Sequence, residues 1–172
     1  MANFLTRRVA NGIGFLVCCS LMAYALYAQY VQLLDPCPLC TFQRFAVIAM
    51  GVVFLLATLH NPKQIGARVY AVLVVVVALI GIGISAKHIW IQAQPPGSIP
   101  SCGAGLSYLF DIMPVFGVIK KVLSGSGECQ HADKILGISW PWWTAAAMAG
   151  LGTWGAVTNW LAPKIVTRKS AF

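Results

Sequence analysis

The sequence predicts an all-α membrane protein, a four-transmembrane-helix bundle with two external loops and with the N- and C-termini cytoplasmic. Of its 172 residues, 59% are hydrophobic and 9% are charged, whereas a soluble domain carries about 25% charged residues. The mean hydropathy is +0.77. The apolar runs are continuous instead of alternating, which favours helices over the strands of a membrane barrel. We therefore expect one membrane domain over residues 1–172.

Four segments lack acidic and basic side chains for long enough to cross a bilayer. These uncharged runs are 26, 18, 18 and 29 residues long. A helix needs about 20 apolar residues to cross a hydrocarbon core of ~30 Å, and about 17 suffice. The predicted helices cover about residues 12–31, 43–60, 67–89 and 142–162, and the predicted external loops cover about residues 32–42 and 90–141.

The charges predict how the bundle is oriented. With four helices, the N-terminus, the loop after the second helix and the C-terminus lie on one side. That side carries the bases Arg7, Arg8, Lys63, Arg68, Lys164, Arg168 and Lys169 and no acid. The positive-inside rule makes this side cytoplasmic. The net charge of +8 forms no basic face outside these short segments, so no nucleic-acid partner is expected.

The alternative interpretation of the first predicted helix is a cleaved signal peptide. Arg7 and Arg8 precede an apolar run that ends in the small-residue stretch AYALYAQ, which resembles a cleavage site. The uncharged run is longer than the 7–15 residues of a signal-peptide core. We therefore expect the helix to be retained.

The predicted topology sorts the six cysteines. Two of them, Cys18 and Cys19, lie within the first helix, where buried thiols pack as small hydrophobic groups. The other four fall in the external loops: Cys37, Cys40, Cys102 and Cys129. In an oxidising compartment four cysteines imply disulfides, and three pairings are possible.

The simplest pairing joins Cys37 to Cys40 and leaves Cys102 with Cys129. A bond between the distant pair would constrain a long loop and add ~3 kcal/mol of stability. The small Cys37–Cys40 ring constrains almost nothing, and such CxxC pairs are suited to exchange chemistry. A structural zinc site is the alternative, but it needs four ligands, usually as two close pairs. Since His131 is the only extra ligand nearby in sequence, we expect no metal.

The stretch DPCPLCTFQR indicates a reactive cysteine at a helix start. Pro36 and Pro38 discourage helix before the second cysteine, so the second helix should begin near Cys40 or Thr41. The positive end of the helix dipole, together with Arg44 one turn on, favours the thiolate form of Cys40. The alternative for Arg44 is a membrane-surface anchor. A thiolate beside the bilayer suggests a lipid-soluble electron acceptor.

These features together resemble a known family. External CPLC followed by TFQR, two spaced cysteines in the second loop, and four helices are similar to the disulfide bond formation protein B family of bacterial inner-membrane, quinone-dependent thiol oxidases. The resemblance extends over essentially the whole chain, including SGECQHADKILGISWPWW. It implies a membrane thiol oxidoreductase that reoxidises a periplasmic thioredoxin-fold disulfide donor (DsbA-like). The electrons would pass to ubiquinone or menaquinone, with the cysteines facing the periplasm.

The resemblance also assigns residues to a quinone site. It implies that Cys37–Cys40 is the quinone-linked pair, that Cys40 contacts the quinone and that Arg44 holds a quinone oxygen. His88 matches a position that lines this site, although a histidine at the membrane interface is the alternative. Gln43 stands where some members carry an acid, which leaves the charge of the site open.

The second loop would meet the soluble partner. The resemblance implies that the partner's thiolate attacks Cys102 in the Cys102–Cys129 pair. Proline and glycine in QPPGSIPSCGAG predict a mobile tether. Residues 106–123 are too polar to cross the membrane but mostly apolar, which predicts a segment in the interface that bends near Pro114. A fifth core element is the alternative.

Small residues in the last two predicted helices allow close helix packing. They are Gly81, Gly83, Gly150, Gly152, Gly155 and the alanines at 145–147. Two rival functions are a vitamin-K-epoxide-reductase-like protein, whose CxxC lies near a later helix, and a membrane scaffold with a stapled loop. A scaffold would be insensitive to Cys37→Ser.

Overall fold

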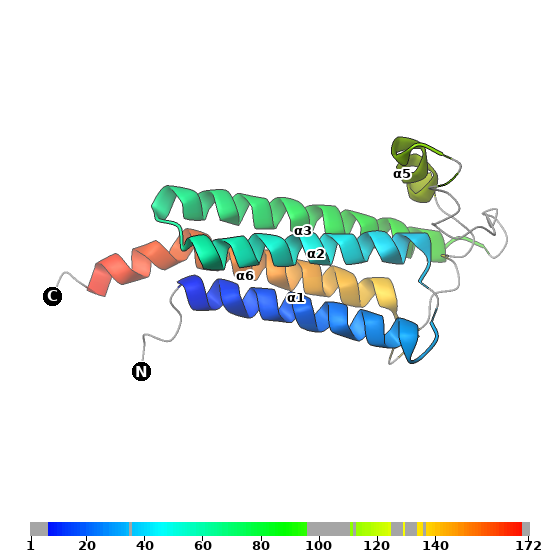
Figure 1. Ribbon diagram of the computed structural model, residues 1–172, viewed down its shortest axis with the longest axis horizontal. Coiled ribbons are helices and arrows are strands. Elements are labelled where there is room, and N and C mark those ends of the chain that lie inside the picture. Colours follow the sequence, from blue (N-terminus) through cyan, green and yellow to red (C-terminus); the bar gives the residue numbers. More distant parts are fainter. Residues whose placement is uncertain are drawn as a thin grey trace.

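Four long helices lie side by side in the computed structural model, and a short helix sits at one end of them (Figure 1). The structure describes residues 7–34, 36–95, 111, 113–124, 129, 134–135 and 137–169. In chain order the elements are α1 (Arg7–Tyr30), α2 (Pro38–His60), α3 (Gln64–Gln92), α5 (Val115–Ser124), β1 (Lys134–Ile135), β2 (Ile138–Ser139) and α6 (Trp140–Lys169). Helix α1 begins and α6 ends at the end of the bundle opposite α5.

Three helices in the described part of the chain are long and apolar enough to cross a membrane, namely α1, α2 and α3. The first three predicted spans are confirmed as helices of this kind. Helix α6 contains the fourth predicted span and packs mainly along α3, with a smaller contact to α1. That α6 also crosses the membrane, and that both termini are cytoplasmic, stay predictions.

The start of α2 differs from its prediction. The helix begins at Pro38, with Cys37 as its N-cap at φ −63° and ψ 160°, and not at Cys40 or Thr41. The physical reason is that the first helical position needs no N–H donor, and the fixed φ of proline suits it. Pro38 therefore starts the helix, and the CPLC stretch forms its N-cap and first turn.

A tight connection joins α2 to α3. Asn61 adopts a left-handed conformation at φ 41°, and its N–H donates to the carbonyl of Ala57, which satisfies one of the last carbonyls of the helix. Residues 61–63 then lead directly into α3. The two helices therefore form an antiparallel hairpin, which returns the chain to the cysteine end.

A fully apolar cluster fills the middle of the bundle, and we call it the mid-bundle core. It comprises Cys18, Ala46, Val47, Met50, Phe54, Val74, Ala78, Met148 and Leu151. Close approach of α6 depends on Gly155, because a Cβ there would lie 2.6 Å from Cγ1 of Val74 and 3.0 Å from the ring of Phe54. A Cβ on Gly150 would meet nothing within 4 Å. Of the small residues predicted to pack closely, Gly155 is thus in tight contact with its neighbours, whereas Gly150 is not.

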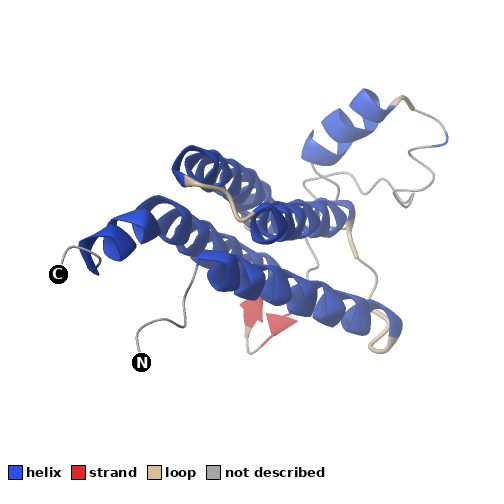
Figure 2. Ribbon diagram, turned by 60° about the vertical axis from the view of Figure 1, so that its left-hand side comes forward, coloured by secondary structure: helices blue, strands red, loops and turns tan. Residues whose placement is uncertain are grey.

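Helix α5 lies at the cysteine end of the long helices (Figure 2), and its buried side chains pack against α2 and α3. It begins directly after Pro114, so the predicted bend near this proline is confirmed, while residues 106–110 lie outside the described residues. Val118 and Val122 are buried, whereas Phe116 is 80% exposed. A two-stranded β1–β2 hairpin, which the sequence did not predict, precedes α6, and Gly137 supplies its turn with a φ of 82°.

Candidate active site

The CxxC pair occupies the first turn of α2. The N–H of Cys40 donates to Sγ of Cys37 over 3.4 Å, so the first cysteine caps the helix through its sulfur. The two sulfur atoms lie 3.2 Å apart, beyond the ~2.05 Å of a disulfide. No disulfide joins the pair in this structure, and the sulfur atoms are close enough to form one after a small side-chain rotation.

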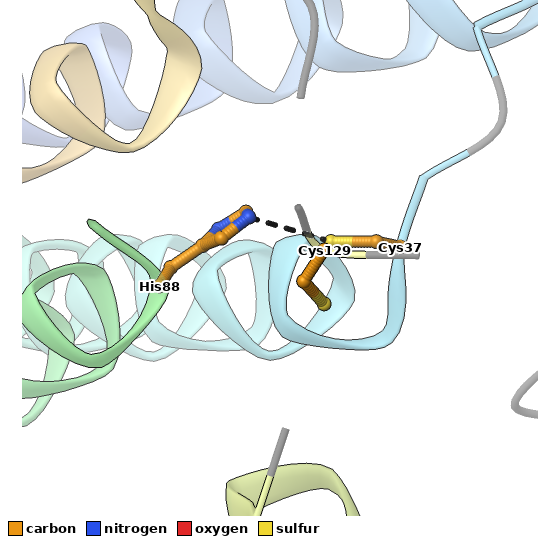
Figure 3. Close-up of side chains that lie close together, drawn as sticks. All are labelled: Cys37, His88 and Cys129. Carbon is orange, nitrogen blue, oxygen red and sulfur yellow. Dashed lines mark hydrogen bonds between the residues drawn. The ribbon is translucent and has the colours of Figure 1, made fainter. Parts of the chain in front are cut away.

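A histidine and a third cysteine meet Cys37 on one side. Nε2 of His88, near the end of α3, lies 3.7 Å from Sγ of Cys37. The ligand atoms of Cys37, His88 and Cys129 all lie within 4.8 Å of one another, and Figure 3 shows the three side chains converging. His88 is 0% exposed and Cys129 is 1% exposed. We call these three residues, with Cys40 beside them, the sulfur cluster.

Apolar packing holds this cluster in place. Leu39 of α2 and Ile91 of α3 are fully buried against Val118 and Val122 of α5, and Cys129 belongs to the same buried group. Because Cys129 follows α5 closely in sequence, docking of α5 on the bundle brings this cysteine back to the start of α2. The amphipathic helix therefore has a positioning role that its sequence alone did not reveal.

A cavity of about 530 Å³ opens on the other side of Cys40. Its volume is in the range of small-molecule sites, which are mostly apolar with a few polar groups. The polar side chains that matter for a ligand are Cys40, Arg44 and Gln43. The other lining residues come from α1, α2 and α6: Leu21, Met22, Tyr24, Ala25, Val47, Trp140, Trp143, Thr144, Ala146 and Ala147. The rings of Tyr24 and Trp140 stack with centroids 5.6 Å apart, which gives the cavity a flat apolar wall.

Two hydrogen-bonded side chains give the cavity its polarity. The guanidinium of Arg44 donates to Oε1 of Gln29 and to the carbonyl of Ala25, the latter over 3.2 Å, which orients its charge toward α1. Gln43 is 2% exposed, and its Nε2 donates to Oγ of Ser85 over 3.2 Å. Its Oε1 has no hydrogen-bond partner within the described residues. Gln29 and Ser85 carry no signal in the sequence that would have marked them.

The structure thus groups five of the six predicted site residues. Cys37, Cys129 and His88 converge, Cys40 adjoins Cys37, and Arg44 lines the cavity with Cys40. His88 faces the sulfur atoms and is not one of the residues that line the cavity. Cys102 lies outside the described residues. Their assigned roles stay predictions, but the arrangement links the buried thiol of Cys129 and the half-buried thiols of Cys37 and Cys40 to an apolar cavity.

The sequence of this chain matches those of known proteins. The family model described as "Disulfide bond formation protein DsbB" matches residues 7–158. This chain belongs to the DsbB family. Relatives named disulfide bond formation protein B include one from Nitrosococcus oceani, 47% identical over 141 residues, which cover 81% of this chain and 83% of that protein. Another, from Methylococcus capsulatus, is 44% identical over 153 residues, which cover 88% and 93%.

A third relative of the same name, from Xanthomonas oryzae pv. oryzae, is 46% identical over 144 residues, which cover 83% of this chain and 84% of that protein. The match to the DsbB family includes α1, α2, α3, α5 and every cysteine of the chain. The protein is therefore a DsbB-family membrane protein of disulfide bond formation, as the resemblance predicted.

Proposed function

We propose that this protein is a quinone-dependent protein-thiol oxidoreductase that reoxidises a periplasmic thioredoxin-fold dithiol oxidase (DsbA-like). One observation carries the proposal: the Cys37–Cys40 pair lies between the buried sulfur of Cys129 and the cavity lined by Cys40. Electrons can therefore enter the pair from one side and leave it on the other. The proposed location is the bacterial inner membrane, with the cysteine end facing the periplasm.

The entry side supports a sequence of thiol–disulfide exchanges. A thiolate of the reduced partner attacks Cys102 of a Cys102–Cys129 disulfide, forms a mixed disulfide and releases the Cys129 thiolate. Cys129 then attacks Cys37, since their sulfur atoms lie within 4.8 Å. This forms a Cys37–Cys129 bond and releases the thiolate of Cys40.

Resolution restores both the partner and the second loop. The second thiol of the partner attacks its own mixed-disulfide sulfur, so the partner leaves oxidised and Cys102 is released as a thiolate. Cys102 attacks Cys129, which re-forms their disulfide and leaves Cys37 and Cys40 as a dithiol. In sum, two electrons and two protons have moved from the partner to the Cys37–Cys40 pair.

The exit side fits a quinone ring. The cavity is mostly apolar, it places the thiol of Cys40 in its wall, and Arg44 offers donors to an oxygen of the ring. When bound, the quinone would supply the two-electron oxidation that returns Cys37 and Cys40 to a disulfide. The carbonyl of Gln43, without a partner among the described residues, could accept a hydrogen bond from a hydroxyl of the reduced ring. His88, 3.7 Å from Cys37, is placed to accept the proton of that thiol.

Quinol production by the purified protein tests the proposal. With a reduced thioredoxin-fold partner and a soluble ubiquinone or menaquinone analogue, we expect oxygen-independent quinol formation. Cys40→Ser should abolish it, whereas Cys19→Ser, an exposed cysteine of α1, should retain it. A normal rate in Cys40→Ser would end the proposal. Unchanged partner oxidation in Cys37→Ser would instead support a scaffold with a stapled loop.

A further inference from the structure

The sulfur cluster also contains the donor atoms of a metal site, although the sequence predicted no metal. CxxC alone lacks the ligands of a metal site, and no close second pair follows it in sequence. The fold supplies the missing donors from distant segments, His88 from α3 and Cys129 from the loop after α5. We propose that the reduced protein binds one thiophilic divalent cation of the Zn²⁺ class through Cys37, His88 and Cys129.

The distances between donor atoms fit such an ion. Zinc–sulfur bonds of about 2.3 Å and zinc–nitrogen bonds of about 2.0–2.1 Å place the donors of a tetrahedral site roughly 3.5–3.8 Å apart. Nε2 of His88 and Sγ of Cys37 are already 3.7 Å apart. All three donor atoms lie within 4.8 Å of one another, so shifts of about 1 Å complete the site.

The fourth position has a candidate at hand. Sγ of Cys40 lies 3.2 Å from Sγ of Cys37, and it can complete a tetrahedron by rotating about its side-chain bonds. A water molecule is the alternative fourth ligand, as in zinc sites with three protein ligands. Cys37, His88 and Cys129 are therefore essential in this proposal, and Cys40 strengthens binding without being required.

Charge favours a divalent ion in this place. With water as the fourth ligand, two cysteines lose their protons on binding, which releases two protons per ion and moves no electron. Two thiolates and a doubly charged cation form a neutral unit, which the burial of His88 and Cys129 requires. A singly charged ion would leave a net negative charge buried. The imidazole of His88 binds as a neutral ligand and adds no charge.

The site would exist in one redox state. A Cys37–Cys40, Cys37–Cys129 or Cys102–Cys129 disulfide removes a thiolate ligand, so the cation binds only the fully reduced protein, in which Cys37 and Cys129 are both thiols. Binding would block the reoxidation of the CxxC pair. Zn²⁺ would therefore act as a reversible inhibitor of the reduced protein. This inhibitory effect rests on the proposed function, whereas cation binding itself does not.

Cadmium titration of the purified full-length protein tests binding directly. Cd²⁺ prefers the same ligands and gives an ultraviolet charge-transfer band when it binds thiolates. We expect the anaerobically reduced protein to bind one equivalent and to show this band. The quinone-oxidised protein should show neither. Equal binding by the oxidised form would overturn the proposal.

Variants identify the ligands. Cys129→Ser should eliminate the high-affinity equivalent, and His88→Ala should weaken binding by at least ~10-fold. His60→Ala is the matched control, because His60 pairs with Tyr70 at the other end of α2 and should not affect binding. His88→Gln keeps most of the buried volume, so it should weaken binding even if His88→Ala fails to fold. Unchanged binding in Cys129→Ser would refute the ligand set.

Two further measurements separate this inference from the proposed function. Cys102→Ser should retain full binding, and loss of binding in this variant would make Cys102 a ligand and overturn the proposed ligand set. Zn²⁺ added to reduced enzyme should stop turnover, and a chelator should restore it. If the protein binds Cd²⁺ in the reduced state but never oxidises thiols, the proposed function fails and the cation site stands. If it oxidises thiols but binds no Cd²⁺, the cation site alone fails.

Discussion

The mid-bundle core and the sulfur cluster are built on the same helices in opposite ways. In the middle, Phe54 and its neighbours form an entirely apolar contact, and Gly155 allows α6 to approach α2 and α3 within van der Waals distance. At the cysteine end, α1, α2 and α6 leave a cavity, and α2 and α3 bury polar groups. The difference indicates that tight packing in the middle gives the rigidity that lets the end remain open and reactive.

The largest effect is expected from a cysteine at the reactive end. Cys129→Ser should abolish turnover with the protein partner, because no sulfur remains to attack Cys37. When oxidised partner is added to this variant, the Cys102 thiolate can attack the partner's disulfide and release its other sulfur as a thiolate, so acid trapping should show the partner linked to Cys102. Recovery of the partner at Cys37 alone would overturn the order of the two pairs. Cys18→Ser in the mid-bundle core is the matched control, and it should keep activity.

Substitution of Arg44 should have a large effect on the apparent KM for quinone and none on the KM for the protein partner. Hydrogen bonds to charged groups contribute about 1.5–3 kcal/mol, so Arg44→Ala should raise the apparent KM for quinone by about tenfold or more. The KM for the protein partner should not change. Arg68→Ala, whose guanidinium lies 5.8 Å from the ring of Trp160 at the opposite end, should leave both constants unaltered. Unchanged quinone dependence in Arg44→Ala would reduce this residue to an anchor.

A substitution in the mid-bundle core should change the stability of the protein and not its chemistry. Gly155→Ala forces a methyl group against Val74 and Phe54, and such overpacking costs about 1–3 kcal/mol. Gly150→Ala on the same helix meets no neighbour within 4 Å and should be neutral. Thermal unfolding in detergent compares the two. Equal stabilities would show that α6 does not pack as closely as the structure indicates.

The smallest effect is expected at the polar contact between α1 and α6. Asn11 and Asn159 are both 0% exposed and exchange two hydrogen bonds, of 3.0 Å and 2.9 Å. Hydrogen bonds between membrane helices contribute about 0.6 kcal/mol on average and at most ~1.7. A double-mutant cycle of the two alanine variants should give a coupling energy in this range. A coupling near zero would mean that the two amides act independently.

The sequence predicted the reactive groups better than their arrangement. Continuous apolar runs, CPLC and Arg44 one turn later were enough to predict the helices and the CxxC pair at a helix start. The start of α2 differs from its prediction, because proline disfavours the interior of a helix but suits its first position. His88 was identified, but its approach to Cys37 depends on how α3 packs against α2.

Other features arise from contacts between segments that are far apart in the chain. The walls of the cavity come from α1 and α6, and nothing in either segment alone shows which face meets α2. The return of Cys129 to Cys37 depends on burial of Val118 and Val122 against Leu39 and Ile91. Local patterns predict elements, whereas these pairings are set by packing.

A small tilt of α3 at the short link of residues 61–63 would move the far end of the helix by a much larger distance. His88 lies 24 residues beyond Gln64, which is about 36 Å of helix at ~1.5 Å per residue. A tilt of roughly 3° at that link would swing the imidazole by about 2 Å over such a length, more than half its distance of 3.7 Å from the sulfur of Cys37. Substitutions near the far end can therefore change the distance between His88 and the Cys37 thiol without touching either residue.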